Sequence, residues 1–367
     1  MSTNHPLQFF LGSNTKRGFV SLFEEFRKPA SGRHLYILKG GPGSGKSTLM
    51  RRIAKTLEDI GHSIEYIPCA SDPNSLDAFY DKEAGIAMID GTAPHTMEPK
   101  YPGAYDTIIN LGDVWDNDEL YHNRKKIMEL SNMISLYHSM ATSCITSAAA
   151  LLDCNQKAAE AYVNQKSVHS FLGIIGDELS LTSKGCEKIR LLSAVSVGKL
   201  EFFEETLTQL SPKLYKIPDE WGAASGTLLA ALHDHSLAML YEMITCYCSI
   251  HTPEQIDHLI FPHAKVGVST ANTFHNVNSK DCIVIEGLYH PMKKTLTDTL
   301  NLQLTFAKNL IETAGSHVAK AKLYHDELEA FYISAMNFSR VDEISGRIIN
   351  EIVHTKPQEA PIQASPV

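Results

Sequence analysis

A glycine-rich loop with a lysine and a hydroxyl side chain at fixed positions is the stretch of this sequence best suited to chemistry. Residues 40–47 read GGPGSGKS and fit the pattern G-x-x-x-x-G-K-[ST] at every fixed position. Glycines let backbone N–H groups converge on phosphate oxygens, and a helix that starts there adds the positive end of its dipole. The residues predicted to bind a nucleotide are Gly40, Gly41, Pro42, Gly43, Ser44, Gly45, Lys46, Ser47 and Thr48.

Each polar side chain of this first loop (residues 40–47) has an expected role. Lys46 should reach the β- and γ-phosphates, the Ser47 hydroxyl should ligate Mg²⁺, and Thr48 should lie near the α-phosphate. Residues 33–39 alternate as a strand does, and a helical pattern runs from the loop to about residue 60. This context favours a phosphate-binding loop over a chance glycine-rich turn.

An acidic residue at the end of a second apolar run is expected to complete the magnesium site. Residues 84–90 read AGIAMID, so that Asp90 closes a buried strand and joins Ser47 as a predicted Mg²⁺ ligand. The next residue is Gly91, where many ATPases carry a glutamate that polarises water. The sequence therefore identifies a metal ligand but no hydrolytic base.

Further charged residues near these motifs have two interpretations each. Asp72 follows the strand predicted at 63–69. It could position Mg²⁺ or water, and it is then a catalytic candidate together with Lys46 and Asp90. Alternatively, it could serve a turn beside Pro73. Lys16 and Arg17 could approach the phosphates, although a solvated turn is the favoured interpretation.

The second half of the chain repeats the first. A shift of 179 residues places Thr227 on Thr48 and Tyr215 on Tyr36, and one inserted residue later makes the shift 180. Under that alignment the chemical residues are lost: Asp219 replaces Gly40, Ala224 replaces Gly45, Ser225 replaces Lys46, Gly226 replaces Ser47 and Thr270 replaces Asp90. A long internal repeat indicates a duplicated structural unit.

The duplication separates residues of the fold from residues of the chemistry. Positions kept in both halves, such as Asp77 with Asp257 and His95 with His275, are expected to serve the fold. In the second loop (residues 219–226) the absent lysine predicts that nucleotide binding has lapsed, and Asp219 should repel phosphate. The loop is expected to keep its shape because the fold needs the turn.

Composition narrows the functional classes. The 367-residue chain carries a formal net charge of −9, which gives no general attraction to nucleic acid. Its seven cysteines form no CxxC pair, a usage that suits a reducing, cytoplasmic environment. Neither a signal peptide nor a membrane span of about 18 apolar residues is predicted.

The expected architecture is α/β, with two tandem P-loop-type domains, each a parallel sheet flanked by helices. Helical periodicity covers about 117–170 and 292–353, which predicts a helical hairpin inserted in each domain. The expected domains are residues 1–185 and 186–355. Residues 356–367, rich in Pro, Gln and Ala, are predicted to form a disordered tail.

The motifs together resemble an uncharacterised bacterial family of tandem P-loop proteins, found mainly in spore-forming Gram-positive bacteria and described as ATPase or nucleotide kinase by motif alone. The resemblance covers nearly the whole chain and rests on GSNTKRGFVSLF at 12–23, GGPGSGKSTLM at 40–50, CASDPNSLD at 69–77, DGTAPH at 90–95 and YHDELE at 324–329. In the family the second loop also usually resembles GxxGTGKST. This chain departs from the family there.

The function expected from the sequence is Mg²⁺-dependent ATP binding with slow hydrolysis in the first half, coupled to a rearrangement against an inert second copy. An ATP-dependent kinase of a small acceptor, such as a nucleotide or metabolite, is the alternative. A nucleotide-gated scaffold with little turnover is the third possible function. A protein partner or an oligomer is compatible with each of these three functions.

Overall fold

The computed structural model describes residues 6–27, 34–179, 185–251 and 253–354, and the tail predicted at 356–367 lies outside these ranges. The chain divides into two compact units. The first-sheet unit contains residues 6–12, 21–138 and those from 318 onward, and the second-sheet unit contains 13–20 and 139–317. The domain boundaries expected from the sequence stay predictions.

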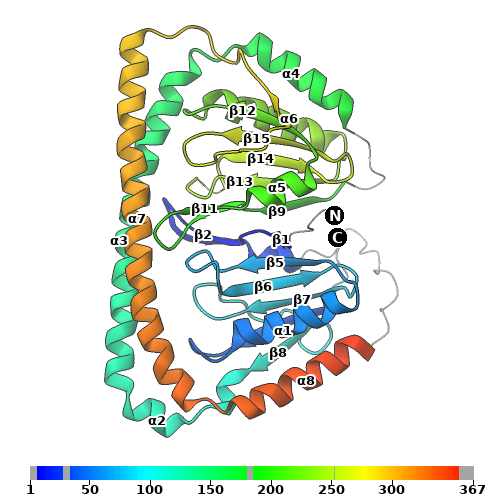
Figure 1. Ribbon diagram of the computed structural model, residues 1–367, viewed down its shortest axis with the longest axis vertical. Helices are drawn as coiled ribbons and strands as arrows, with labels where there is room; N and C mark the ends of the chain where they lie inside the picture. The colour runs from blue at the N-terminus through cyan, green and yellow to red at the C-terminus, as the bar shows by residue number, and fades with distance from the viewer. Residues whose placement is uncertain (1–5, 28–33, 180–184, 252, 355–367) are drawn as a thin grey trace. The chain divides into compact units, whose positions relative to one another are not determined.

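The first-sheet unit is built on a six-stranded sheet with the order β1-β5-β6-β7-β4-β8 (Figure 1). Strand β4 is parallel to both its neighbours, β7 and β8, and β1 is parallel to β5. The strands are β1 (Leu7–Gln8), β4 (His34–Lys39), β5 (Ile64–Pro68), β6 (Leu76–Asp81), β7 (Ile86–Asp90) and β8 (Asp106–Asn110).

Helix α1 (Lys46–Asp59) packs on this sheet through one apolar stripe. Its buried residues recur at the three- and four-residue spacing of a helix face, and they are Leu49, Met50, Ile53, Ala54 and Leu57. Helix α8 (Phe338–His354) contributes Val341 and Ile348 to the same core. The burial of this stripe fixes the direction of α1, and hence the position of the loop that precedes it.

The second-sheet unit repeats this topology strand for strand, in the order β9-β13-β14-β15-β12-β16. Its strands are β9 (Glu187–Arg190), β12 (Lys213–Pro218), β13 (Met243–Tyr247), β14 (Ile256–Phe261), β15 (Val266–Ala271) and β16 (Ile283–Val284). Helix α6 (Ala223–Ala238) follows β12 as α1 follows β4. Both α/β units predicted from the repeat are therefore present.

Strand register matches the shift of 179 and then 180 residues found in the sequence. Leu38 pairs with Asp90 in the first sheet, and Ile217 pairs with Thr270 in the second. A register irregularity follows Ile67 in β5 and recurs after Cys246 in β13. The alignment of the two halves, inferred from scattered sequence identities, thus also matches the residues that pair between strands.

The prediction of wholly parallel sheets was wrong for one strand in each unit. β6 runs antiparallel to β5 and β7, and β14 runs antiparallel to β13 and β15. In the first unit, only residues 69–75 and 82–85 connect β6 to its neighbours. Such short connections suit antiparallel neighbours, whereas a parallel crossover needs a dozen or more residues.

Two long helices account for most of the predicted helical stretches. They are α3 (Arg124–Glu160) and α7 (Lys294–Ala335), accompanied by α2 (Asn117–His122) and α4 (Gln165–Glu178). The expected self-contained hairpins were wrong, since α3 and α7 pair with each other: Tyr137 stacks on Tyr324 in the first-sheet unit, and Asn155 donates to Leu300 O in the second-sheet unit. Neither helix contains proline, and α3 also lacks glycine, so nothing in either sequence breaks the helix.

The remaining elements are short. β2 (Gly12–Thr15) pairs with β3 (Gly18–Ser21), β10 (Ser193–Val195) pairs with β11 (Leu200–Phe202), and the short helices are η1 (Phe23–Arg27), η3 (Leu111–Val114) and α5 (Glu204–Leu210). Among the described residues, no helix combines the length and apolar character needed to cross a membrane.

Candidate functional site

The first loop lies between the carboxyl end of β4 and the start of α1, as the sequence predicts. Gly43 and Gly45 have φ angles of +69° and +87°, in the left-handed region that favours glycine. Gly45 is the N-cap residue of α1 and makes no side-chain cap, so the first N–H groups of the helix face the loop. Such a helix start favours an anion.

Lys46 folds back over the loop instead of extending into solvent. Its Nζ atom donates to Gly40 O at 2.7 Å and to Gly41 O at 2.8 Å, and it lies 3.5 Å from Asp90 Oδ2. The lysine is 9% exposed. The ammonium group is thus held by two weak neutral acceptors and one carboxylate, at the place where phosphate oxygens could replace the carbonyls.

Asp90 and Ser47 are positioned by different strands. Asp90 ends β7 opposite Leu38, and its Oδ1 atom accepts from the backbone and hydroxyl of Thr92. The Ser47 hydroxyl accepts from Leu76 N at 2.9 Å, which ties the start of α1 to β6. The structure therefore brings Lys46 and Asp90 together, while Ser47 is held by a hydrogen bond of its own.

Asp72 lies in the turn before β6. Its Oδ1 atom accepts from Asn74 N at 3.2 Å, and its Oδ2 atom lies 3.4 Å from the Nζ atom of Lys322 on α7. These contacts match the turn interpretation of Asp72. Its catalytic role stays a prediction.

The outer side of the first loop is covered by residues that sequence reasoning missed. A Cβ atom at Gly41 would lie 2.5 Å from the ring of Tyr332, and one at Gly43 would lie 2.8 Å from Glu329 O. The absence of a side chain at these glycines therefore lets α7 approach the first loop closely. The segment YHDELE, noted for its family resemblance, ends at Glu329 and was the available signal.

A polar cavity of about 660 Å³ lies beside this contact, in the first-sheet unit. Trp115 and Tyr332 have ring centroids 5.6 Å apart, and Asn337 N donates to Val114 O at 2.9 Å, so that η3 is tied to the turn between α7 and α8. The cavity is lined by residues 113–116, 119 and 334–340, which include the exposed guanidinium of Arg340.

The second loop closes on a carboxylate of its own. Asp219 is 3% exposed and accepts from Trp221 N, Gly222 N and Ser225 N at 2.8–3.0 Å. Tyr289 donates its hydroxyl to Asp219 at 2.8 Å and accepts from Ala224 N at 3.0 Å. Asp219 was expected to repel phosphate, and the structure adds that it takes up the amide groups of the loop itself.

Lys16 and Arg17 are paired with carboxylates of the second-sheet unit. Lys16 Nζ lies 3.3 Å from Asp153 Oδ2 and 2.5 Å from Glu254 Oε2, and Arg17 forms an ion pair with Glu254. The hydrogen bond from Lys16 holds the pKa of Glu254 below its usual range. Both cations therefore form ion pairs. The sequence had favoured a solvated turn at these residues.

His95, which both halves keep, is also held by a carboxylate. Its Nε2 atom lies 2.9 Å from Asp77 Oδ2, and both residues are buried. Burial works against a charged imidazole, but the adjacent Asp77 carboxylate outweighs it and raises the pKa of His95. The pair stabilises the end of the sheet near Asp90.

Comparison with known proteins gives one match. Residues 20–79 match a family model described as Nephrocystin 3, N-terminal. That segment contains the first loop and β4, α1 and β5. No curated protein and no solved structure matches the chain. These comparisons neither support nor contradict the resemblance to the bacterial tandem family.

Proposed function

We propose that the protein binds ATP with Mg²⁺ at the first loop and hydrolyses it slowly. The observation that carries this proposal is the convergence of Lys46 and Asp90 at 3.5 Å on a glycine loop that opens a helix. The Lys46 ammonium would leave the two loop carbonyls for the β- and γ-phosphates, since an ionised acceptor forms the stronger hydrogen bond.

The residues present suit magnesium. Ser47 and Asp90 offer a hydroxyl and a carboxylate oxygen, and Mg²⁺ takes oxygen ligands and is commonly held by one or two protein groups together with substrate phosphates. Bound Mg²⁺ would neutralise charge on the β- and γ-phosphates. Lys46 would hold the γ-phosphate from the other side.

Helix α7 supplies the proposed link between nucleotide and conformation. Glu329 O and Tyr332 lie against Gly43 and Gly41, so a loop that tightens around phosphate would change its packing on α7. Residues 294–317 of the same helix belong to the second-sheet unit. We therefore assign to α7 the conformational change that follows nucleotide binding. The second copy, which binds no nucleotide in this proposal, would change its arrangement in response.

A kinase acting on a small acceptor is the second candidate. The polar cavity of about 660 Å³ favours it, because its wall includes Phe338, which packs against Gly45 of the first loop. Arg340 and the carboxylates of Asp113 and Asp116 could orient a polar acceptor there. The size suits a small molecule, since ligand pockets commonly span about 300–1,000 Å³.

The fate of the γ-phosphate tests the proposal. Purified protein would be incubated with γ-labelled ATP and Mg²⁺, with and without a pool of small metabolites. We expect slow release of inorganic phosphate that Lys46→Ala abolishes and Lys55→Ala, an exposed lysine on the same helix, leaves unchanged. Label transferred to an acceptor would establish the kinase instead. Neither product, at full occupancy with ATP, would support the scaffold and contradict the ATPase.

A further inference from the structure

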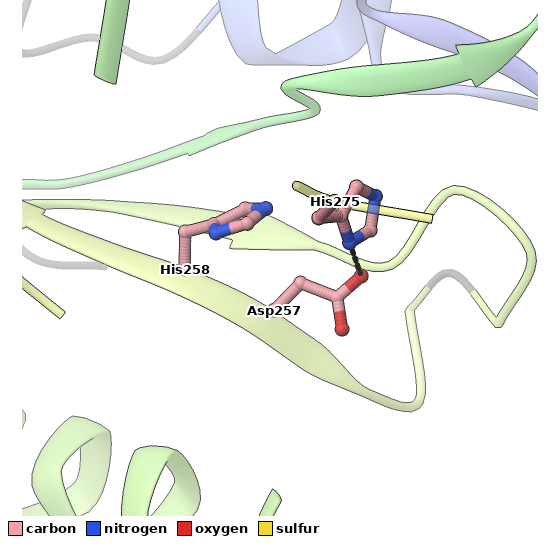
Figure 2. Close-up of side chains that lie close together, drawn as sticks. All are labelled: Asp257, His258 and His275. Carbon is pink, nitrogen blue, oxygen red and sulfur yellow. Dashed lines mark ion pairs between the residues drawn. The ribbon is translucent and has the colours of Figure 1, made fainter. Parts of the chain in front are cut away.

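Three metal-ligating side chains converge inside the second-sheet unit, away from the second loop's own hydrogen bonds. Asp257 and His258 are consecutive residues of β14, and His275 lies in the turn after β15. Their exposed fractions are 2%, 1% and 2%, respectively. Figure 2 shows the two imidazoles and the carboxylate pointing toward one another.

The hydrogen bonds of His258 favour one tautomer of its ring. His258 Nδ1 lies 2.7 Å from the hydroxyl of Ser269, and that hydroxyl donates its own hydrogen to Thr270 O at 3.2 Å. In this arrangement Ser269 accepts from the Nδ1–H group. The Nε2 atom of His258 is left with a lone pair, and it is buried without a hydrogen-bond partner.

His275 has the opposite arrangement of its ring nitrogens: Nε2 makes the outer hydrogen bond, and Nδ1 faces the cluster. His275 Nε2 lies 2.8 Å from Ser193 Oγ, which donates to Ser249 Oγ at 3.1 Å. The Nδ1 atom of His275 is then the one with a lone pair, and it lies 3.5 Å from Asp257 Oδ2. Neither of these two facing atoms has a hydrogen-bond partner.

Three buried atoms without a hydrogen-bond partner thus lie close together. A buried acceptor that lacks a partner is costly, and facing lone pairs repel unless a cation lies between them. We propose that Asp257 Oδ2, His258 Nε2 and His275 Nδ1 bind one divalent transition metal ion, with Zn²⁺ as the preferred occupant. Two imidazoles and one carboxylate form an established zinc ligand set.

The distances suit such an ion after a small adjustment. Zinc–nitrogen bonds of about 2.0–2.1 Å place tetrahedral ligand atoms roughly 3.4 Å apart. The His275–Asp257 pair is already at 3.5 Å, and each of the three residues has one potential ligand atom within 4.8 Å of those of the other two. The outer ring nitrogens donate to the hydroxyls of Ser269 and Ser193, and these hydrogen bonds orient the rings, as outer partners of metal-bound histidines do.

A small cavity connects the cluster to the second loop. Its volume is about 40 Å³, enough for a water molecule, and its lining includes Asp257, His275, Cys248 and Gly222. Water in this cavity would complete a four-coordinate ion. An open ligand position of this kind lets a metal bind a small molecule.

The first half of the chain provides an internal comparison. There the equivalent residues Asp77 and His95 lie 2.9 Å apart and satisfy each other, and Ala78 replaces the additional histidine. The second half has kept the aspartate–histidine pair, loosened it to 3.5 Å and added His258. The addition of one ligand residue thus accompanies the loss of the nucleotide motif.

Metal content and titration of the full chain test the site. Protein purified without chelator should contain one zinc per chain, and chelated protein should regain one equivalent of Zn²⁺ or Co²⁺ in titration. His258→Ala, which installs the residue of the first half, should weaken binding by more than about 100-fold, the largest loss that follows removal of an outer hydrogen-bond partner. His95→Ala should keep full metal content.

Spectroscopy of the unmodified chain covers the case in which His258→Ala does not fold. X-ray absorption at the zinc edge should show two imidazoles and oxygen ligands, with no sulfur. A full chain that binds neither Zn²⁺ nor Co²⁺, Fe²⁺ or Mn²⁺ would overturn the proposal. Binding that survives unchanged in a folded His258→Ala variant, or a sulfur-rich coordination shell, would also overturn it.

Discussion

Asp219 Oδ2 accepts the backbone N–H of Ser225 at 2.8 Å, so the second loop binds a carboxylate of its own through the first turn of α6. Ser225 aligns with Lys46, and Asp219 aligns with Gly40. The amide groups of the second loop are therefore satisfied by a carboxylate of the loop itself. This carboxylate explains how the loop keeps its turn without a lysine.

Removal of this carboxylate should destabilise the second-sheet unit. Asp219→Ala leaves buried N–H groups without an acceptor, and we expect a loss of about 1–3 kcal/mol in the free energy of unfolding. Urea denaturation measures this change. Asp234→Ala, on the exposed side of α6, is the matched control and should have little effect. Equal stability of the Asp219 variant and the unmodified protein would show that the carboxylate does not hold the loop.

The packing of α7 on the first loop predicts a double-variant result. Gly41→Ala should cost about 1–3 kcal/mol by overpacking against Tyr332, and Tyr332→Ala should relieve much of that cost. The measurement is a double-mutant cycle on the free energy of unfolding. Additive effects of the two substitutions would contradict a direct contact.

Gly43→Ala should behave differently, because its Cβ atom would meet the backbone oxygen of Glu329 and its φ is +69°. No side-chain substitution on α7 can relieve this contact. Gly61→Ala is the control, since Gly61 has a φ of +96° but no atom within 4 Å of the added Cβ. The Gly43 variant should be clearly less stable than the Gly61 variant in the same denaturation assay.

The His95–Asp77 pair predicts a pH dependence. Because the pKa of His95 is raised by folding, the pair's contribution is fully present below the unfolded value of about 6.5 and is lost as pH rises through the folded pKa. Stability measured from pH 5.5 to pH 8.5 should show this loss. Asp77→Asn should remove it, and a slope that persists in this variant would assign the effect to another group.

Hydrolysis by the isolated protein should be slow, below roughly 1 s⁻¹, the low end of ordinary turnover. Gly91 follows Asp90 where a catalytic base often stands, and neither Lys16 nor Arg17 is free of carboxylate partners. A partner protein could supply the missing group, as activating proteins do for GTPases. Fast turnover by the purified chain would contradict this prediction and direct attention to Asp72 or His95.

The sequence predicted those features that depend on local patterns. The strand, loop and helix around Lys46 follow from glycine spacing and periodicity, and the pairing of Ile217 with Thr270 follows from the internal repeat. The antiparallel β6 was missed because apolar strands look alike in either direction. The contact of Tyr332 with Gly41 was missed because the two residues lie 291 positions apart in the chain (332 − 41), and only folding brings them together.

The metal cluster was missed for a related reason. Asp257 and His275 were interpreted as residues of the fold because both halves keep them, and His258 carried no motif. Adjacent residues of a strand point to opposite faces, so a convergence of Asp257 and His258 could not be predicted from their positions in the chain. Only the hydrogen bonds that the outer ring nitrogens make to Ser269 and Ser193 indicate the two free lone pairs.

Calorimetric titration with a slowly hydrolysed ATP analogue and Mg²⁺ tests the central claim most directly. We expect one binding site per chain, lost in Lys46→Ala, because the main cation for the phosphates is gone, and retained in Lys55→Ala. Asp90→Asn should weaken Mg²⁺-dependent turnover more than nucleotide binding. A site that remains in Lys46→Ala, or two sites in the unmodified chain, would contradict an active first loop paired with an inert second copy.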